Sequence, residues 1–183
     1  KSSAQAIYCL SNTKQLTLCW LLYASDNADA LTVNPDWVQD HSHVDGQAMD
    51  WNYNNANTNW NMLVTASSSS LFLPYNKSPG IYECPGDNIP SKNGRRVRSY
   101  TMNSSLNNSG VPAAAPGNSL PGRIYFRARK MSDLATPGPA NCFVFLDESA
   151  YTLLVSGGST FSFDAGLPSH LEHWRSLPAF YHG

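Results

Sequence analysis

The sequence contains few charged residues. Asp, Glu, Lys and Arg make up 14% of its 183 residues, against about 25% in an average soluble protein. Asn, Ser and Thr must therefore supply much of the polar surface. The formal net charge is −1 and no basic stripe is present, which argues against a nucleic-acid partner. One short basic cluster, Arg95, Arg96 and Arg98, is predicted to be a solvated strand edge.

The sequence also lacks long apolar runs and cysteines at C-x-x-C spacing. No stretch of 18 apolar residues occurs, so these residues do not encode a membrane-spanning helix. Its four cysteines, Cys9, Cys19, Cys84 and Cys142, include no C-x-x-C pair, and a structural zinc site is not indicated. Low charge, many Asn and Ser and four cysteines are typical of exported proteins, in which disulfides persist. Three pairings of the cysteines are possible, and spacing does not choose between them.

Motifs of catalysis are missing as well. There is no G-x-S-x-G nucleophile motif, and Gly157-Gly158 is too short for a phosphate loop. A zinc-dependent hydrolase is the enzyme alternative, with ligands from Asp40 to His43 and from His170 to His173. The sequence H-L-E-H does not have the H-E-x-x-H spacing of metalloproteases, and Pro168 and Pro178 leave room only for a short helix. The prediction is that the protein is not an enzyme.

A long helix is predicted at the N-terminus. Apolar residues recur at helical spacing from the first residues to the turn formers near Asp26 to Asp29, which gives a helix of about 25 residues within 1–29. On one side lie Ile7, Leu10, Leu18, Leu21 and Leu22, and Leu16, Trp20 and Tyr23 widen this surface, whereas polar Gln5, Asn12 and Gln15 interrupt it.

The remaining chain is predicted to complete a single α+β domain. Residues 30–95 form a loop-rich segment with a short helix at 58–66. Residues 96–183 form a small antiparallel sheet with long loops, among them the Pro-rich loop 111–121. Its strands are expected at 96–102, 124–126 and 142–146, with 142–146 in the centre, and a further one at 151–155 or 160–163.

Aromatic residues among many Asn side chains raise an alternative function. Trp51, Tyr53 and Trp60 lie in or beside the Asn-rich stretch 52–61. Aromatic faces stack on sugars while amides bond to hydroxyl groups. The alternative is an exported carbohydrate-binding or surface-binding module, and the simpler interpretation is that most of these rings are core.

Several segments together resemble one known family. The stretch Ala4 to Leu16 contains C-x-x-N-x-K-Q-L. Tyr82 to Asp87 fits Y-x-C-P-x-D, Arg98 to Asn103 fits R-S-Y-x-M-N, and Phe143 to Glu148 reads F-V-F-L-D-E. Leu177 to Gly183 is similar to the approach to an H-x9-D-G element. In this order, the segments resemble type II secretion pseudopilin G-like proteins, which are type IV pilin-like subunits with a prepilin-type cleavage and methylation signal.

The resemblance implies a fold and a function. A long N-terminal helix would pack on a small antiparallel sheet, with Ile7, Leu10 and Leu18 turned toward the sheet. A membrane-anchoring segment would precede Lys1, and the chain would assemble with other pilin or pseudopilin subunits and with the secretion machinery. The protein would be exported, anchored in the inner membrane with a periplasmic domain before assembly or part of an extracellular filament. A bridge between Cys9 and Cys84 would tie the C-P-G-D loop to the helix.

Two further site hypotheses follow. Cys19 and Cys142 either form a second bridge or remain separate buried thiols. Asp147, Glu148 and Asp164 supply oxygen ligands that suit calcium, and related pseudopilins use a C-terminal calcium loop, so a structural calcium ion is the one cofactor considered. The competing interpretation is that Asp147 or Glu148 accepts hydrogen bonds from loop amides. Asp87 is expected to cap a turn.

Overall fold

A computed structural model describes residues 2–33, 58–64, 70–103, 106–107, 128–135, 138–149, 160–161, 179 and 181. The described part is α+β, as predicted. Its elements in chain order are α1 (Ser2–Asp26), α2 (Asn61–Val64), η3 (Pro79–Tyr82), β1 (Tyr100–Asn103), η4 (Met131–Ala135), η5 (Pro139–Asn141), β2 (Phe145–Asp147) and β3 (Thr160–Phe161), where η denotes a 3-10 helix.

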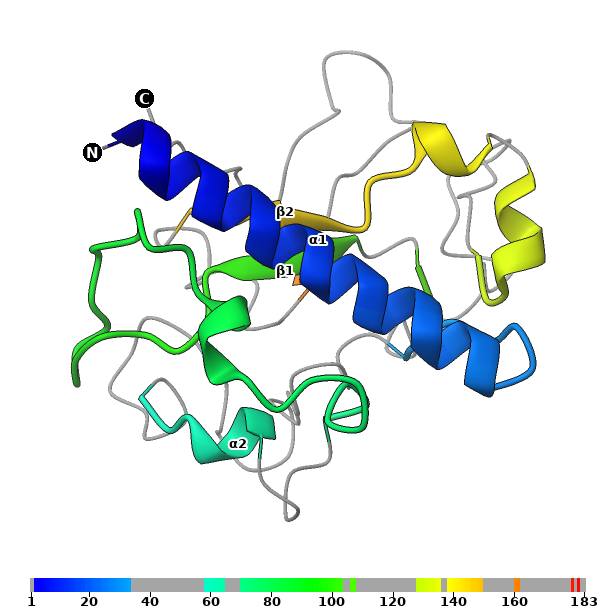
Figure 1. Cartoon of the computed structure of the whole chain (residues 1–183), viewed down its shortest axis with the longest axis horizontal. Helices are drawn as coiled ribbons and strands as arrows, with labels where there is room; N and C mark the ends of the chain where they lie inside the picture. Colours follow the sequence, from blue (N-terminus) through cyan, green and yellow to red (C-terminus); the bar gives the residue numbers. More distant parts are fainter. Residues whose placement is uncertain are drawn as a thin grey trace, which may run out of the picture.

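The long helix α1 crosses the sheet and extends beyond it at both ends (Figure 1). It has 25 residues and contacts η3 and β2, so the predicted length and position of the helix are confirmed. Ala28 (φ 52°) and Asp29 (φ 69°) follow its last turn in the left-handed region. The backbone N–H of Asp29 donates to the carbonyl of Ala24 at 2.9 Å, which closes the helix in the manner of a C-terminal capping motif.

The sheet in the described part has three short strands in the order β2-β1-β3. β1 and β2 are antiparallel, with Tyr100 opposite Asp147 and Met102 opposite Phe145. β1 and β3 are parallel, with Met102 opposite Thr160. Two predictions are therefore corrected: β1, rather than the segment 142–146, is the central strand, and the sheet is mixed rather than wholly antiparallel.

The strands are also shorter than their sequence patterns predicted. Pairing starts at Tyr100, although the period-two alternation starts at Arg96. Just before Tyr100 the chain also bonds outside the sheet: the N–H of Ser99 donates to the carbonyl of Tyr82, whereas the Ser99 carbonyl still accepts from the N–H of Glu148, each at 2.9 Å. At the other strand, η5 ends at Asn141 and β2 begins only at Phe145. An alternating pattern indicates a strand, but its length is set by the partner that is available.

One apolar core joins α1, the segment after it and the sheet. Its most buried large side chains include Leu16 of α1, Leu63 of α2, Phe72, Tyr82 and Tyr100. Phe72 and Phe145 form an edge-to-face pair with ring centroids 6.1 Å apart. The helix predicted over 58–66 is present as α2, Asn61–Val64. The predicted strands at 124–126 and 151–155 and the loop 111–121 lie outside the described residues.

Candidate functional site

The helix α1 carries apolar side chains on two opposite faces. Its inward face contributes Cys9, Leu16, Cys19, Trp20 and Ala24 to the core, each with 4% exposure or less. We call the other side the outward face; its exposed apolar residues are Ile7, Tyr8, Leu10, Leu18, Leu21 and Leu22, with exposures from 41% to 71%.

The prediction that Ile7, Leu10 and Leu18 face the sheet is wrong. Ile7 and Leu18 are eleven residues apart and so share one side of the helix, whereas Leu16, two residues before Leu18, lies nearly opposite. Leu16 is fully buried, and Leu18 is 55% exposed. The apolar stripe was identified, but the domain packs on the other side of the same helix.

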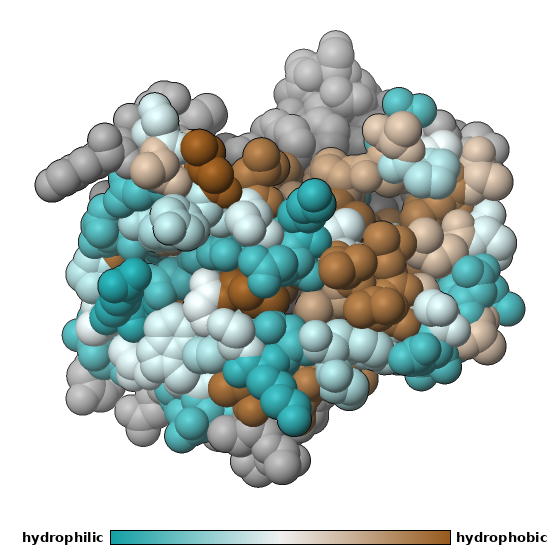
Figure 2. Space-filling view, viewed as in Figure 1, coloured by the Kyte–Doolittle hydropathy of each residue, from teal (hydrophilic) through white to brown (hydrophobic). Residues whose placement is uncertain are grey.

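The outward face is most apolar over the second half of α1, whereas hydrophilic side chains lie among the apolar ones over the first half (Figure 2). Figure 2 shows apolar side chains gathered over the second half of the helix, where Leu18, Leu21 and Leu22 lie. Lys14 is the only charged residue between Ser2 and Ser25. Single exposed leucines are ordinary on protein surfaces, but a contiguous apolar strip on a helix indicates a surface that another element covers.

The inward face is attached to the loop around Cys84 by a disulfide and by side-chain hydrogen bonds. Cys9 and Cys84 form a disulfide with their Cα atoms 5.1 Å apart, so the predicted pairing is present. The amide of Asn12 donates to the carbonyl of Glu83 at 2.9 Å, and the amide of Gln5 donates to the carbonyl of Pro85 at 3.1 Å. In the sequence pattern Gln5 and Asn12 interrupt an apolar stripe; their helical spacing from Cys9 was the available signal that they share its side.

Buried charges support the loop that carries Cys84. The Arg96 guanidinium pairs with the carboxylate of Asp87, and both side chains are only 3% exposed. It also donates to the carbonyls of Ile89 (3.1 Å) and Arg98 (3.2 Å). Arg98 is buried too, and donates to the carbonyl of Tyr100 at 2.6 Å. The prediction of a solvated edge is therefore wrong for Arg96 and Arg98, because carbonyl and carboxylate partners replace water around them.

Asp87 connects this ion pair to the turn after Cys84. One carboxylate oxygen accepts from the N–H of Ile89 at 3.2 Å, which confirms the predicted turn cap, and the other accepts from the hydroxyl of Ser99 at 2.7 Å. Arg95 is 69% exposed at its side chain and pairs with Glu83. Burial raises the pKa of Glu83 above its usual value, although Arg95 opposes this shift.

Two of the three proposed calcium ligands, Asp147 and Glu148, lie at the end of β2. Asp147 is half-buried in the strand, and Glu148 is fully buried. The backbone of Glu148 donates to the carbonyl of Ser99 at 2.9 Å and accepts from the hydroxyl of Tyr181 at 2.7 Å. Asp147 and Glu148 are adjacent in an extended chain, in which successive side chains point to opposite sides, and this argues against both carboxylates binding one ion. Asp164 lies outside the described residues, so the calcium site stays a prediction.

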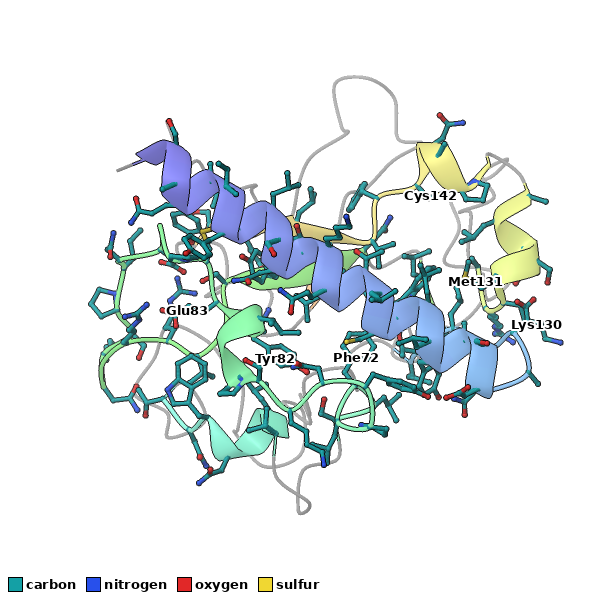
Figure 3. The ribbon with its side chains drawn as sticks, in the orientation of Figure 1. Phe72, Tyr82, Glu83, Lys130, Met131 and Cys142 are labelled. Carbon is teal, nitrogen blue, oxygen red and sulfur yellow. A yellow bond between two sulfur atoms is a disulfide. The ribbon has the colours of Figure 1, made fainter. Side chains whose placement is uncertain are left out.

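The second predicted bridge is absent. Cys19 is a buried free thiol in α1, and Cys142 is a half-buried free thiol. Figure 3 shows Cys142 next to η5, well away from Phe72 and Tyr82 beneath α1. Burial raises the pKa of the Cys19 thiol, which favours the protonated and less reactive form. The alternative of two separate thiols therefore describes the structure.

Residues of the alternative functions are only partly described. Trp60 is half-buried and packs against the core, whereas Trp51 and Tyr53 lie outside the described residues, as do all five histidines and therefore the ligands of the zinc alternative. The carbohydrate-binding alternative stays a prediction without support from Trp60.

Within the described residues, no helix combines the length and the apolar character needed to cross a bilayer. Comparison with family models, with curated proteins and with solved structures gave no match.

Proposed function

We propose that the protein is a structural subunit of a type II secretion pseudopilus or a type IV pilus-like filament, and that the outward face of α1 packs against neighbouring subunits. The observation that carries this proposal is that a single helix has apolar side chains on two faces, of which the described residues of its own domain cover only one. Ile7, Leu10 and Leu18 are each more than half exposed.

The energetics favour a partner for this face. Burying one Leu or Ile side chain is worth about 1.5–3 kcal/mol, so even partial burial of the strip on neighbouring helices stabilises an assembly. The disulfide between Cys9 and Cys84 keeps the globular part attached to the inward face of the helix, while the outward face remains available for contacts with other subunits.

The proposal includes the setting in which assembly takes place. An apolar segment before Lys1 would hold the subunit in the inner membrane until the secretion machinery adds it to the filament. Before assembly the domain would be periplasmic, where the disulfide between Cys9 and Cys84 persists. The motif resemblance supports this setting, and the disulfide is consistent with an oxidising compartment.

The test uses the full-length precursor expressed with its secretion machinery. The double variant Leu18→Ser and Leu21→Ser is compared with Phe143→Ser, because Phe143 is an exposed apolar residue (38%) that is not on α1. We expect the double variant to be processed and folded but missing from sheared filaments, and the Phe143 variant to assemble as the wild type does. The proposal fails if the wild-type precursor is never processed and never enters filaments, or if the double variant assembles normally.

A further inference from the structure

Three ligand atoms of the kind that zinc prefers meet beneath the N-terminal half of α1. They are the sulfur atoms of Cys9 and Cys84 and a carboxylate oxygen of Asp147, and all three lie within 4.8 Å of one another. They come from α1, from the loop after η3 and from β2. In the structure the two sulfurs are joined in the disulfide, so they cannot act as thiolate ligands in that state.

We propose that the chain with this disulfide reduced is a zinc-binding protein, with Cys9, Cys84 and Asp147 as the three protein ligands. Zinc binds thiolate sulfur at about 2.3 Å and carboxylate oxygen at about 2.0–2.2 Å in a tetrahedral arrangement. Three protein ligands leave the fourth position to water. Asp147 is only half-buried, so this position is placed toward solvent.

The helix and the loop are held together without the disulfide. Gln5 and Asn12 donate to the carbonyls of Pro85 and Glu83, the residues on either side of Cys84. These hydrogen bonds persist when the sulfur–sulfur bond is cleaved, so Cys9 and Cys84 remain neighbours. The sulfurs then need to separate only to the distance of two ligands on one ion.

The strand that carries Asp147 is fixed independently as well. Asp147 is opposite Tyr100 in the β1–β2 pairing. The N–H of Glu148 donates to the carbonyl of Ser99, and the N–H of Ser99 donates to the carbonyl of Tyr82, each at 2.9 Å. Because this series of bonds joins β2 to the chain just before Cys84, the carboxylate stays beside the sulfurs after reduction.

A backbone donor already points at one of the sulfurs. The N–H of Gly86 lies 3.4 Å from the Cys84 sulfur, and a hydrogen bond of this kind favours the anionic form of its acceptor. Both cysteines are buried, Cys9 at 4% exposure and Cys84 at 0%. Two buried thiolates and a carboxylate repel each other unless a cation lies between them, and a divalent ion supplies that charge.

The chemistry balances in two steps. A phosphine reductant cleaves the sulfur–sulfur bond and becomes a phosphine oxide with an oxygen atom from water, and each sulfur gains a proton. Zinc then displaces the two thiol protons as it binds. Because bound zinc occupies both thiolates, it also slows re-formation of the disulfide. This inference does not depend on the filament proposal, since it concerns only the isolated chain.

The experiment titrates the 183-residue chain with cobalt and then with zinc, under anaerobic conditions and after removal of the reductant. Cobalt reports tetrahedral thiolate coordination through its visible bands and its sulfur-to-metal charge-transfer band. We expect one cobalt per reduced chain, displaced by zinc, and no such bands in the oxidised chain or in the double variant Cys9→Ala and Cys84→Ala.

Two matched variants test the carboxylate. Asp147→Asn should weaken zinc binding by about tenfold or more, since loss of a group that supports a metal site typically has an effect of this size. Asp26→Asn, an exposed position on the same helix as Cys9, should bind as the wild type does. Circular dichroism records whether α1 remains folded after reduction.

Four outcomes overturn the inference. They are the absence of thiolate bands in the reduced wild type, equal affinity in Asp147→Asn and wild type, bands that survive in the double cysteine variant, and loss of the helix on reduction. The third would assign the metal to Cys19 or Cys142, and the fourth would show that the ligands are not held in place without the disulfide.

Discussion

The two faces of α1 are both apolar, yet they differ in how they are fixed. The inward face mixes Leu16 and Trp20 with a disulfide and with the amides of Gln5 and Asn12, which bond to specific carbonyls of the loop around Cys84. The outward face has leucines, one lysine and no bond to another element among the contacts described. Directional bonds select one partner in one register, whereas apolar area alone accepts any complementary surface. The difference agrees with the proposed function, in which the inward face has a permanent partner and the outward face gains one on assembly.

Breaking the buried ion pair behind the Cys84 loop should have the largest effect. Arg96→Met leaves the Asp87 carboxylate buried without its charged partner, and removal of one member of such a pair costs about 3–5 kcal/mol. Arg95→Met is the comparison variant, because the Arg95 side chain is 69% exposed whereas its partner Glu83 is only 8% exposed. Burial already raises the pKa of Glu83, so this carboxyl can take up a proton when Arg95 is lost, and we expect a smaller loss than in Arg96→Met. Denaturant unfolding measures both; equal losses would contradict the assignment of Arg96 as the structural member of the cluster.

Removing the disulfide between Cys9 and Cys84 should lower the stability of the fold nearly as much. The disulfide closes a loop of 75 residues, and the entropy of that closure stabilises the fold by on the order of 4 kcal/mol. The double variant Cys9→Ala and Cys84→Ala should unfold at correspondingly lower denaturant concentration. Cys142→Ala, which removes a half-buried free thiol, should change stability by about 1 kcal/mol or less. If the two variants were equally stable, the inward face would depend on its apolar contacts and amide bonds alone.

Leu16 and Leu18 compare the two faces directly. Leu16→Ala should cost about 2–5 kcal/mol, because it leaves a cavity in the core. Leu18→Ala should stay within about 0.5 kcal/mol in the isolated subunit, since Leu18 is 55% exposed. Thermal or denaturant unfolding of both variants checks this order. A large loss with Leu18→Ala would mean that the outward face already has a partner within the chain.

The smallest expected effect is a loss of stability at high pH, caused by ionisation of Tyr82, which is buried in the core beneath the inward face. Burial raises the pKa of Tyr82 from 10.0 to about 12, so between these values the folded chain holds a proton that the unfolded chain has lost. The free energy of unfolding must therefore fall as the pH rises above 10, and Tyr82 contributes about 1 kcal/mol of this loss by about pH 11.

Denaturation of wild type and Tyr82→Phe at several alkaline pH values tests this assignment. The variant should lose stability less steeply, although Tyr100 and Tyr181, whose pKa values burial also raises, keep part of the slope. Identical slopes in the two proteins would show that Tyr82 ionises equally readily in the folded and the unfolded chain.

Local patterns were sufficient for some parts of the molecule. Helical spacing and the turn formers at Asp26 to Asp29 predicted α1 correctly, since a helix depends mainly on residues three and four apart. The pairing of Cys9 with Cys84 was implied by the family resemblance that their motifs carry, and not by the spacing of the cysteines. The lengths of β1 and β2 were not predictable, because a strand continues only where its partner does.

The burial of Arg96 and Arg98 was not predictable for a related reason. Arginine is rarely buried without partners, and its partners here are Asp87, nine residues from Arg96, and backbone carbonyls. No pattern in the sequence shows that a carboxylate and these carbonyls meet away from water.

The sequence by itself determined that a helix of about 25 residues lies within 1–29 and that it has an apolar side widened by Leu16, Trp20 and Tyr23, because those properties follow from neighbours along the chain. Tertiary structure alone decided which side packs on the sheet. The inward side is the one that carries Cys9 and Asn12, whose bonds to Cys84 and Glu83 form only when residues more than seventy positions apart in the sequence come together. Apolar burial favours both sides of such a helix almost equally, so the covalent bond and the directional hydrogen bonds make the choice, and the side they leave exposed is the surface for assembly in the proposed function.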